Sequence, residues 1–266
     1  MTPADAGHGG YDNGAQYEGR KEKDEALDLA LAVGKLLTEE GYDVHYTRTT
    51  DVYQSPIEKA QIANRNGADL FISFHRNASA VPNTYDGVQT LLYDDSGMKA
   101  YMARNINAQL EKVGFKNLGV EVRPNLAVLR GTNMPALLLE VGFIDSDKDN
   151  QIYDQNFNEI VQAIAQGITD TLEQFQPRTG YAVQTGLFRN YSNALYELDR
   201  LERMGFEAQI VPWKEYFAVR VGIVDTLEGA RELEQDLRNL GYSTLIVKET
   251  EVPQPPKPIE GTQNNI

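Results

Sequence analysis

The chain has 266 residues, 41% of them hydrophobic and 24% charged, which is typical of globular proteins and long enough for two unequal domains. Its formal net charge of −14 argues against nucleic acid as a partner, because phosphate groups are bound by an excess of Lys and Arg. The absence of cysteine excludes disulfides and thiolate chemistry, so any metal ion must be held by histidine and carboxylate side chains.

Strand and helix patterns alternate through the first two thirds of the chain. Apolar runs typical of strands cover residues 43–48, 69–75 and 136–142. Apolar residues at spacings of three and four predict helices over residues 26–37, 57–63, 98–110 and 160–172. We therefore predict an α/β domain with a largely parallel, twisted sheet flanked by helices.

This first domain is expected to span residues 1–176, because the periodicity stops where Pro177 and Gly180 fall close together. A second domain is expected over residues 177–248. The last segment, residues 249–266, is rich in proline and polar residues and is predicted to be a disordered tail.

The second domain contains an internal duplication. Tyr181-Ala-Val-Gln-Thr-Gly186 reappears 36 residues later as Phe217-Ala-Val-Arg-Val-Gly222, without a gap. Each copy has the pattern strand, helix, strand, and each helix is followed by a glycine, Gly205 or Gly241, as helix ends often are. Two copies predict a small α+β domain of βαββαβ order.

A βαββαβ order also occurs in RNA-recognition folds, which carry an aromatic and basic surface motif. Residues 178–248 hold 9 basic and 10 acidic side chains and lack such a motif. We therefore expect no nucleic-acid partner for this domain.

Two of the three histidines lie where a ligand could be bound. His8 has glycines on both sides, which let the backbone bend tightly around the imidazole. His75 ends a buried strand and is expected at the carboxyl edge of the sheet, where α/β proteins bind ligands, although a purely structural role is also open. His45 has no acidic or glycine-rich context and is expected to be a surface or packing residue.

Two carboxylates are also candidates. Glu140 follows three leucines in a strand, so burial should raise its pKa and suit it to act as a general base. The alternative is a strand-end carboxylate that reaches solvent or a salt bridge. Glu22 opens a helix, where acidic residues are favoured by the helix dipole alone. Glu18, Asp24 and Glu25 compete with it for any role.

Several segments, taken in order, resemble the zinc-dependent N-acetylmuramoyl-L-alanine amidase family of autolysins and phage endolysins over residues 1 to about 175. They are Gly7-His-Gly-Gly10, Lys21-Glu-Lys-Asp24, Thr47-Arg-Thr49, Ala68-Asp-Leu-Phe-Ile-Ser-Phe-His-Arg-Asn77 and Asn133-Met-Pro-Ala-Leu-Leu-Leu-Glu-Val-Gly-Phe143. The chain departs from the family in having Ala6 where proline is usual and in a less apolar opening strand.

This resemblance implies Zn²⁺ as the cofactor, with His8, Glu22 and His75 as its ligands and Glu140 as the catalytic carboxylate. Three protein ligands leave an open position for water, as catalytic zinc requires. Asn77, at the end of the His75 motif, is expected to bind substrate.

The duplicated domain resembles the SPOR domain, a peptidoglycan-binding module, and Val183-Gln-Thr-Gly-Leu-Phe188 matches its opening motif. The resemblance implies that it recognises glycan strands stripped of peptides. Gln184 offers a hydrogen-bonding amide and Phe188 a stacking face, although strand aromatics more often fill cores.

The implied function is hydrolysis of the amide bond between N-acetylmuramic acid and L-alanine in bacterial peptidoglycan. A zinc peptidase acting on the stem peptides and an inactive wall-binding protein are the alternatives. No apolar run approaches the roughly 20 residues of a membrane span, and no signal peptide is visible. We therefore expect action at the cell wall after release by lysis, a holin or another route, with no membrane partner.

Overall fold

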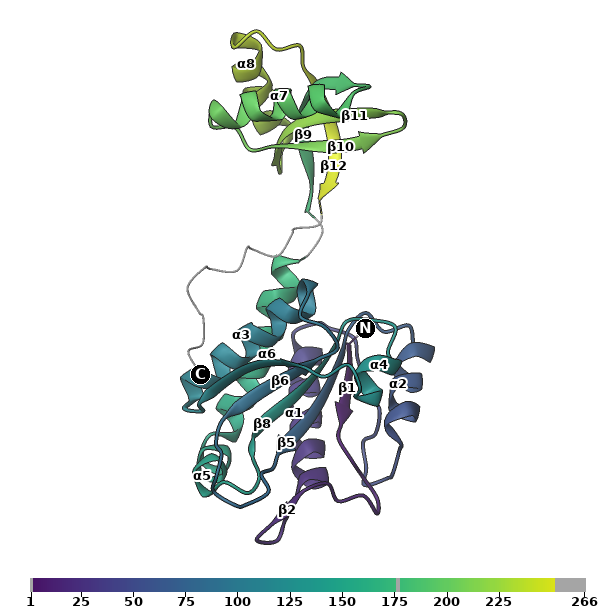
Figure 1. Cartoon of the computed structure of the whole chain (residues 1–266), viewed down its shortest axis with the longest axis vertical. Helices are drawn as coiled ribbons and strands as arrows, with labels where there is room; N and C mark the ends of the chain where they lie inside the picture. The colour runs from purple at the N-terminus through teal and green to yellow at the C-terminus, as the bar shows by residue number, and fades with distance from the viewer. Residues whose placement is uncertain (1, 176–177, 252–266) are drawn as a thin grey trace. The chain divides into compact units, whose positions relative to one another are not determined.

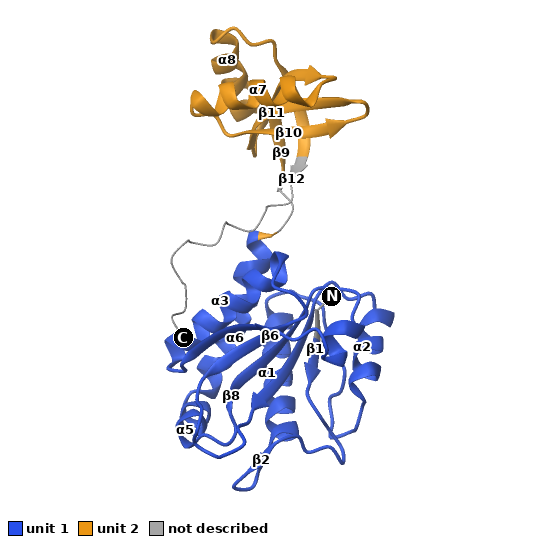
Figure 2. Cartoon of the chain, in the orientation of Figure 1, with its two compact units in different colours: residues 1–174, 255–266 blue, residues 175–254 orange. Residues whose placement is uncertain are grey.

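The computed structural model describes residues 2–175 and 178–251. The chain divides into two compact units, and among these residues the division falls after Gln174 (Figures 1 and 2). The predicted boundary at Pro177 lies outside the described residues. The two units are described separately.

A six-stranded sheet forms the centre of the first unit (Figure 1). Its spatial order is β4 (Val44–Tyr46), β1 (Thr2–Ala6), β5 (Phe71–Asn77), β8 (Ala136–Phe143), β6 (Val88–Leu92) and β7 (Asn117–Val122). All neighbouring pairs are parallel except β8 with β6, which is antiparallel. The predicted largely parallel α/β sheet is therefore confirmed.

Helices cover both faces of this sheet. One core cluster joins the sheet to α1 (Glu22–Glu39), α3 (Gly97–Val113) and α6 (Phe157–Gln174). A second cluster, on the other face, joins it to α2 (Pro56–Arg65) and α4 (Ala127–Gly131). Side chains alternate between these clusters along a strand, as a pleated strand requires, so β5 and β8 are apolar on both sides.

The four helices predicted in this unit are confirmed as α1, α2, α3 and α6. Two further helices, α4 and α5 (Asp147–Gln155), lie outside the predicted elements, as do the strands β6 and β7. A short hairpin of β2 (Gln16–Tyr17) and β3 (Arg20–Lys21) leads into α1. None of the helices that the structure describes is long and apolar enough to cross a membrane.

The second unit confirms the predicted βαββαβ order. It contains β9 (Arg178–Phe188), α7 (Tyr191–Arg203), β10 (Ala208–Trp213), β11 (Tyr216–Val224), α8 (Leu227–Asn239) and β12 (Leu245–Glu251). Its antiparallel sheet has the order β10-β11-β9-β12.

Equivalent residues of the two sequence repeats occupy equivalent places in this unit. Leu201 and Leu237 are both fully buried, as are Ala194 and Ala230 and the strand residues Val183 and Val219. Gly205 and Gly241, which follow the two helices, have φ values of +88° and +90°, a conformation that favours glycine. The duplication in sequence is therefore a duplication in structure.

The predicted start of the tail at residue 249 is wrong. Strand β12 continues to Glu251 because its backbone pairs with β9, with Glu249 opposite Gly180. The Glu249 carboxylate also accepts a hydrogen bond from Arg220 at 2.6 Å. The rest of the predicted tail, residues 252–266, lies outside the described residues.

Candidate active site

Four of the predicted site residues come from neighbouring elements of the first unit. His8 follows β1, His75 lies near the end of β5, Glu140 lies in β8, and Glu22 is the first residue of α1. Because β1, β5 and β8 are adjacent and parallel, their carboxyl ends meet at one edge of the sheet (Figure 1).

The side chains of His8, Glu22 and His75 form a three-residue cluster. His8 Nε2 lies 3.0 Å from Glu22 Oε2, and His75 Nδ1 lies 2.7 Å from Glu22 Oε1. The two imidazole rings are 5.0 Å apart and nearly perpendicular. One nitrogen or oxygen atom from each residue lies within 4.8 Å of the others, so the three can face a single ion.

Hydrogen bonds and charges among these three groups together outweigh the effect of burial on their pKa values. Burial lowers the pKa of His8, but the hydrogen bond and charge of Glu22, with those of Asp12, outweigh it and raise the pKa to about 9. Burial lowers the pKa of His75, but Glu22, together with the charge of Glu140, outweighs it and raises that pKa. Burial raises the pKa of Glu22, but the two histidines outweigh it and lower that pKa. Glu22 therefore stabilises positive charge on both imidazole rings.

Glycines make this approach of side chains sterically possible. A Cβ atom on Gly14 would lie 2.5 Å from Glu22 Oε2 and 2.6 Å from His8 Cδ2, and one on Gly7 would lie 2.4 Å from His75 Cε1. His8 itself has a φ of +57°, which few residues with side chains adopt. Glycines are therefore needed around His8 for two reasons: a larger side chain would clash with the site residues, and the backbone adopts positive φ values.

Glu22, and none of its acidic neighbours, faces the histidines. Backbone amides of Ala15 and Arg76 donate to its two carboxylate oxygens, at 2.9 and 3.3 Å, and fix its orientation. Glu25 bonds instead to the guanidinium of Arg76. Glu18 and Asp24 are exposed.

Asp12 is a site residue that the sequence analysis missed. Its Oδ2 lies 2.9 Å from His8 Nδ1, and its Oδ1 accepts a hydrogen bond from the Gly14 amide. A carboxylate on the far nitrogen of a histidine fixes the ring so that the other nitrogen faces the ligand. The only signal in the sequence was an acidic residue four positions after His8 within the glycine-rich loop.

Glu140 is the register partner of His75, so both side chains lie on the same side of the sheet. Its Oε2 is buried and has no hydrogen-bond partner among the residues that the structure describes. Burial raises the pKa of Glu140 to about 7, although His75 and His8 oppose the shift. A carboxylate in this condition is suited to take up and release a proton near neutral pH.

The remaining residues singled out from the sequence lie apart from this cluster or at its rim. Asn77, two residues after His75, is half-buried, and its Oδ1 accepts a hydrogen bond from the Ala78 amide. His45 is partly exposed in β4, as expected of a surface residue. In the second unit, Gln184 is half-buried in β9, and Phe188 packs against the apolar core.

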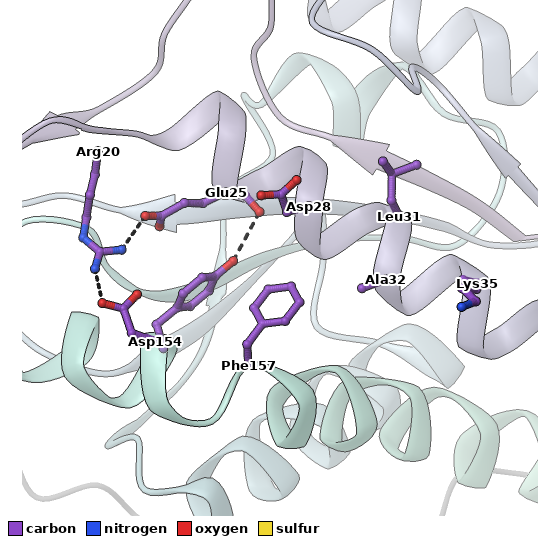
Figure 3. Close-up of a pocket in the computed structure, with 9 residues that line it drawn as sticks. Arg20, Glu25, Asp28, Leu31, Ala32, Lys35, Asp154 and Phe157 are labelled. Carbon is purple, nitrogen blue, oxygen red and sulfur yellow. Dashed lines mark hydrogen bonds and ion pairs between the residues drawn. The ribbon is translucent and has the colours of Figure 1, made fainter.

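A separate cavity of about 620 Å³ opens beside α1 (Figure 3). Three of its charged groups pair with one another, since Arg20 bonds both Glu25 and Asp154. None of the four predicted site residues lines it. No histidine lines the cavity, so the His8, Glu22 and His75 cluster is the better candidate site.

The residues of the cluster suit a zinc ion. Two imidazole nitrogens and one carboxylate oxygen are the donor set of many catalytic zinc sites, which keep one position open. The Glu140 carboxylate, whose Oε2 has no hydrogen-bond partner within the described part of the chain, lies beside the cluster, where a general base would be needed.

Both units match known protein families. Residues 4–170 match the family profile described as N-acetylmuramoyl-L-alanine amidase, and residues 177–248 match the SPOR domain. A sporulation-specific N-acetylmuramoyl-L-alanine amidase of Bacillus subtilis is 34% identical over 218 residues, covering 78% of this chain and 82% of that protein. An endolysin of Bacillus phage SPP1 is 38% identical over 176 residues, covering 63% of this chain and 64% of the endolysin.

Solved structures show the same fold in the first unit. The catalytic domain of the amidase CwlV from Bacillus (Paenibacillus) polymyxa gives a TM-score of 0.59 at 32% identity, covering 65% of this chain and 97% of that one. An N-acetylmuramoyl-L-alanine amidase from Clostridium difficile 630 gives a TM-score of 0.61 at 31% identity, covering 66% and 97%.

Proposed function

Because this chain belongs to the N-acetylmuramoyl-L-alanine amidase family and carries a SPOR domain, we propose that it cuts peptidoglycan with the help of a zinc ion held by His8, Glu22 and His75. Its substrate is peptidoglycan, and its place of action is the bacterial cell wall. The bond is the amide between the lactyl group of N-acetylmuramic acid and L-alanine.

One observation carries the zinc proposal: two imidazoles and a carboxylate, drawn from three separate elements, present ligand atoms within 4.8 Å of one another. When bound there, zinc would supply Lewis acidity to the substrate carbonyl and lower the pKa of water. Asp12 would hold the His8 ring with Nε2 turned toward the ion.

Glu140 is proposed as the group that moves the proton. Its carboxylate accepts a proton from the attacking water while the water oxygen bonds to the lactyl carbonyl carbon. The same group then gives the proton to the alanine nitrogen as the C–N bond breaks. The products are a lactyl carboxylate and a peptide with a free amino group.

The roles of the two units are proposed to be distinct. Residues 1–176 form the catalytic domain, with Asn77 at the rim of the site as a substrate contact. Residues 177–248 form the SPOR domain, which holds glycan strands. Gln184 is the proposed polar contact there, and Phe188, which packs on the core, is expected to support the strand more than to stack on sugar.

Mass spectrometry of digested peptidoglycan tests the reaction. Amidase action leaves peptides with a free L-alanine amino group and glycan strands with intact lactyl carboxylates. A peptidase acting on the stem peptides would leave other termini. A zinc-loaded sample that binds cell walls without clearing them would support the inactive wall-binding alternative.

Removal of the metal tests the cofactor. We expect a chelator to abolish clearing of cell walls and added Zn²⁺ to restore it, with about one equivalent of zinc bound by the active protein. Full activity in metal-free protein would contradict the proposed ligands.

A further inference from the structure

Two loops beside the metal-ligand cluster each present a tyrosine to solvent. Tyr11 is 79% exposed and Tyr53 is 39% exposed. Their rings are stacked, with centroids 4.2 Å apart and planes inclined by 27°. We call this pair the Tyr11–Tyr53 platform. The face of the Tyr11 ring that is turned away from Tyr53 is exposed to solvent. It could therefore contact the proposed substrate, peptidoglycan.

The platform adjoins the cluster. Tyr11 directly precedes Asp12, whose carboxylate bonds the His8 ring at 2.9 Å. Because Tyr11 is three residues from His8, their Cα atoms are separated by at most about 10 Å. When the scissile amide of a substrate lies at His8, a neighbouring unit of the substrate is therefore close enough to contact Tyr11.

The platform is rigidly built. Gly9 and Asp12 exchange two backbone hydrogen bonds, which close the loop that carries Tyr11. Gly10 donates to the Asp51 carboxylate at 2.7 Å, and the buried Lys23 ammonium bonds both the Gly10 carbonyl and Asp51. A surface fixed in this way loses little conformational freedom when it binds a ligand.

The two loops also touch through their backbones. A Cβ atom on Gly10 would lie 2.7 Å from the Tyr53 amide nitrogen, and Gly10 has a φ of +61°. The backbone contact between Gly10 and Tyr53 therefore holds the Tyr11 loop and the Tyr53 loop in position against each other.

The surroundings of the platform are acidic. A hydrogen bond with Tyr53, together with the charges of Asp12 and Glu58, raises the pKa of Tyr11. Asp51, half-exposed and paired with Lys23, adds another carboxylate. Carboxylates accept hydrogen bonds from sugar hydroxyls, and an aromatic face packs against the C–H face of a pyranose ring.

From these observations we propose that the Tyr11–Tyr53 platform is a sugar subsite, which stacks on the N-acetylhexosamine next to the muramoyl residue whose amide is cut. This inference rests on the proposed function of the cluster. The platform selects substrates whose muramoyl residue is still part of a glycan chain.

Steady-state kinetics of the full chain on two soluble substrates test the subsite. The short substrate is a muramoyl peptide without neighbouring sugars, and the long one is a tetrasaccharide carrying the same peptide. We expect Tyr11→Ala to lower the preference for the long substrate, measured as the ratio of the two KM values, by about tenfold, and Tyr11→Phe to keep it. The SPOR domain is present in every variant, so its contribution to the ratio of KM values is the same in all of them and cancels when the variants are compared.

Tyr85→Ala is the matched control, because Tyr85 is another exposed tyrosine of this unit, at 61%, and belongs to neither loop. It should keep the preference. An unchanged preference in Tyr11→Ala would overturn the subsite, as would an equal rise of KM on both substrates, which would instead place Tyr11 against the muramoyl residue or its peptide. Absence of amide cleavage by the unsubstituted chain on either substrate would reject the proposed function, a result distinct from these two.

Discussion

The two units of this chain use charge in different ways. The first unit buries several charged side chains. Three of them, Asp5, Lys59 and Arg76, each form an ion pair with an oppositely charged side chain. In the second unit, the fully buried side chains that the structure describes belong to alanine, valine and leucine. A unit that performs chemistry must hold charged groups out of water in fixed positions. The second unit is stabilised mainly by apolar packing, with the Arg220–Glu249 ion pair beside its core.

The sharpest way to separate chemistry from structure is Glu140→Gln. This change keeps the shape of the side chain but removes the proton acceptor, so we expect hydrolysis to fall by about 10²–10⁴-fold. Release of peptides from labelled peptidoglycan measures the rate, and elemental analysis measures zinc. Zinc should remain near one equivalent; its loss would show that Glu140 is a ligand and not the base.

The buried charges of the first unit predict a large effect on its stability. Lys59 Nζ lies 2.9 Å from Asp5 Oδ1, and both side chains are almost fully buried. Lys59→Met leaves the Asp5 carboxylate without its cation and should lower the free energy of unfolding by about 3–5 kcal/mol. Urea denaturation of the full chain measures it, with Lys35→Met, at an exposed ion pair, as the control that should change it little.

Protonation of Asp5 should weaken the same Asp5–Lys59 ion pair. Burial raises the pKa of Asp5, but Lys59, Ser73 and Thr47 outweigh it, so the pKa lies below its usual value of 3.8. The stabilisation from this lowered pKa is present above about pH 4 and is lost as the pH falls through the folded-state pKa. In melting curves from pH 7 to pH 2.5, Asp5→Asn should lose part of this pH dependence. An identical dependence in both proteins would assign it to other carboxylates.

The apolar core of the second unit predicts equal effects at equivalent places. Leu201→Ala and Leu237→Ala each create a cavity at a fully buried site and should each lower the stability of this unit by about 2–5 kcal/mol. Thermal unfolding of the full chain should show that transition shifted by similar amounts in the two variants. A large inequality would mean that the two repeats carry unequal shares of the core.

The smallest expected effect lies at Asp12. Asp12→Ala frees the His8 ring to turn, so zinc affinity should fall by about 10–100-fold without loss of the fold. Competition with a chelator of known affinity measures the change. An unchanged affinity would show that the glycine-rich loop alone orients His8.

The sequence predicted most of the first unit because its main helices and inner strands have strong periodicity. Helix α5 was missed since its sequence has few apolar residues, and its buried face includes Asp149 and Asn150. Strand β6 is short, and its antiparallel direction against β8 leaves no mark in an apolar pattern. The extension of β12 to Glu251 was hidden because β12 is the edge strand, and its charged residues pair with β9 through the backbone, which leaves no apolar pattern.

The candidate site was predicted in part. His8 and His75 could be chosen from chemistry because the chain has few histidines, and a buried Glu140 was expected to have a raised pKa. Glu22 could be distinguished from its acidic neighbours only through family resemblance, since the choice depends on which side chain points at the histidines. Asp12 and Tyr11 were missed because their roles arise from the closed shape of one loop.

That closed loop, residues 8–12, has a thermodynamic consequence. It contains a proposed zinc ligand, the carboxylate that orients this ligand, and the open face of the platform. The two backbone hydrogen bonds between Gly9 and Asp12 hold His8 and Tyr11 in place before either ligand arrives. Neither binding event therefore has to order the loop, so zinc and sugar should bind with little coupling between them. The zinc affinity of the enzyme should be nearly the same on glycan and free in solution.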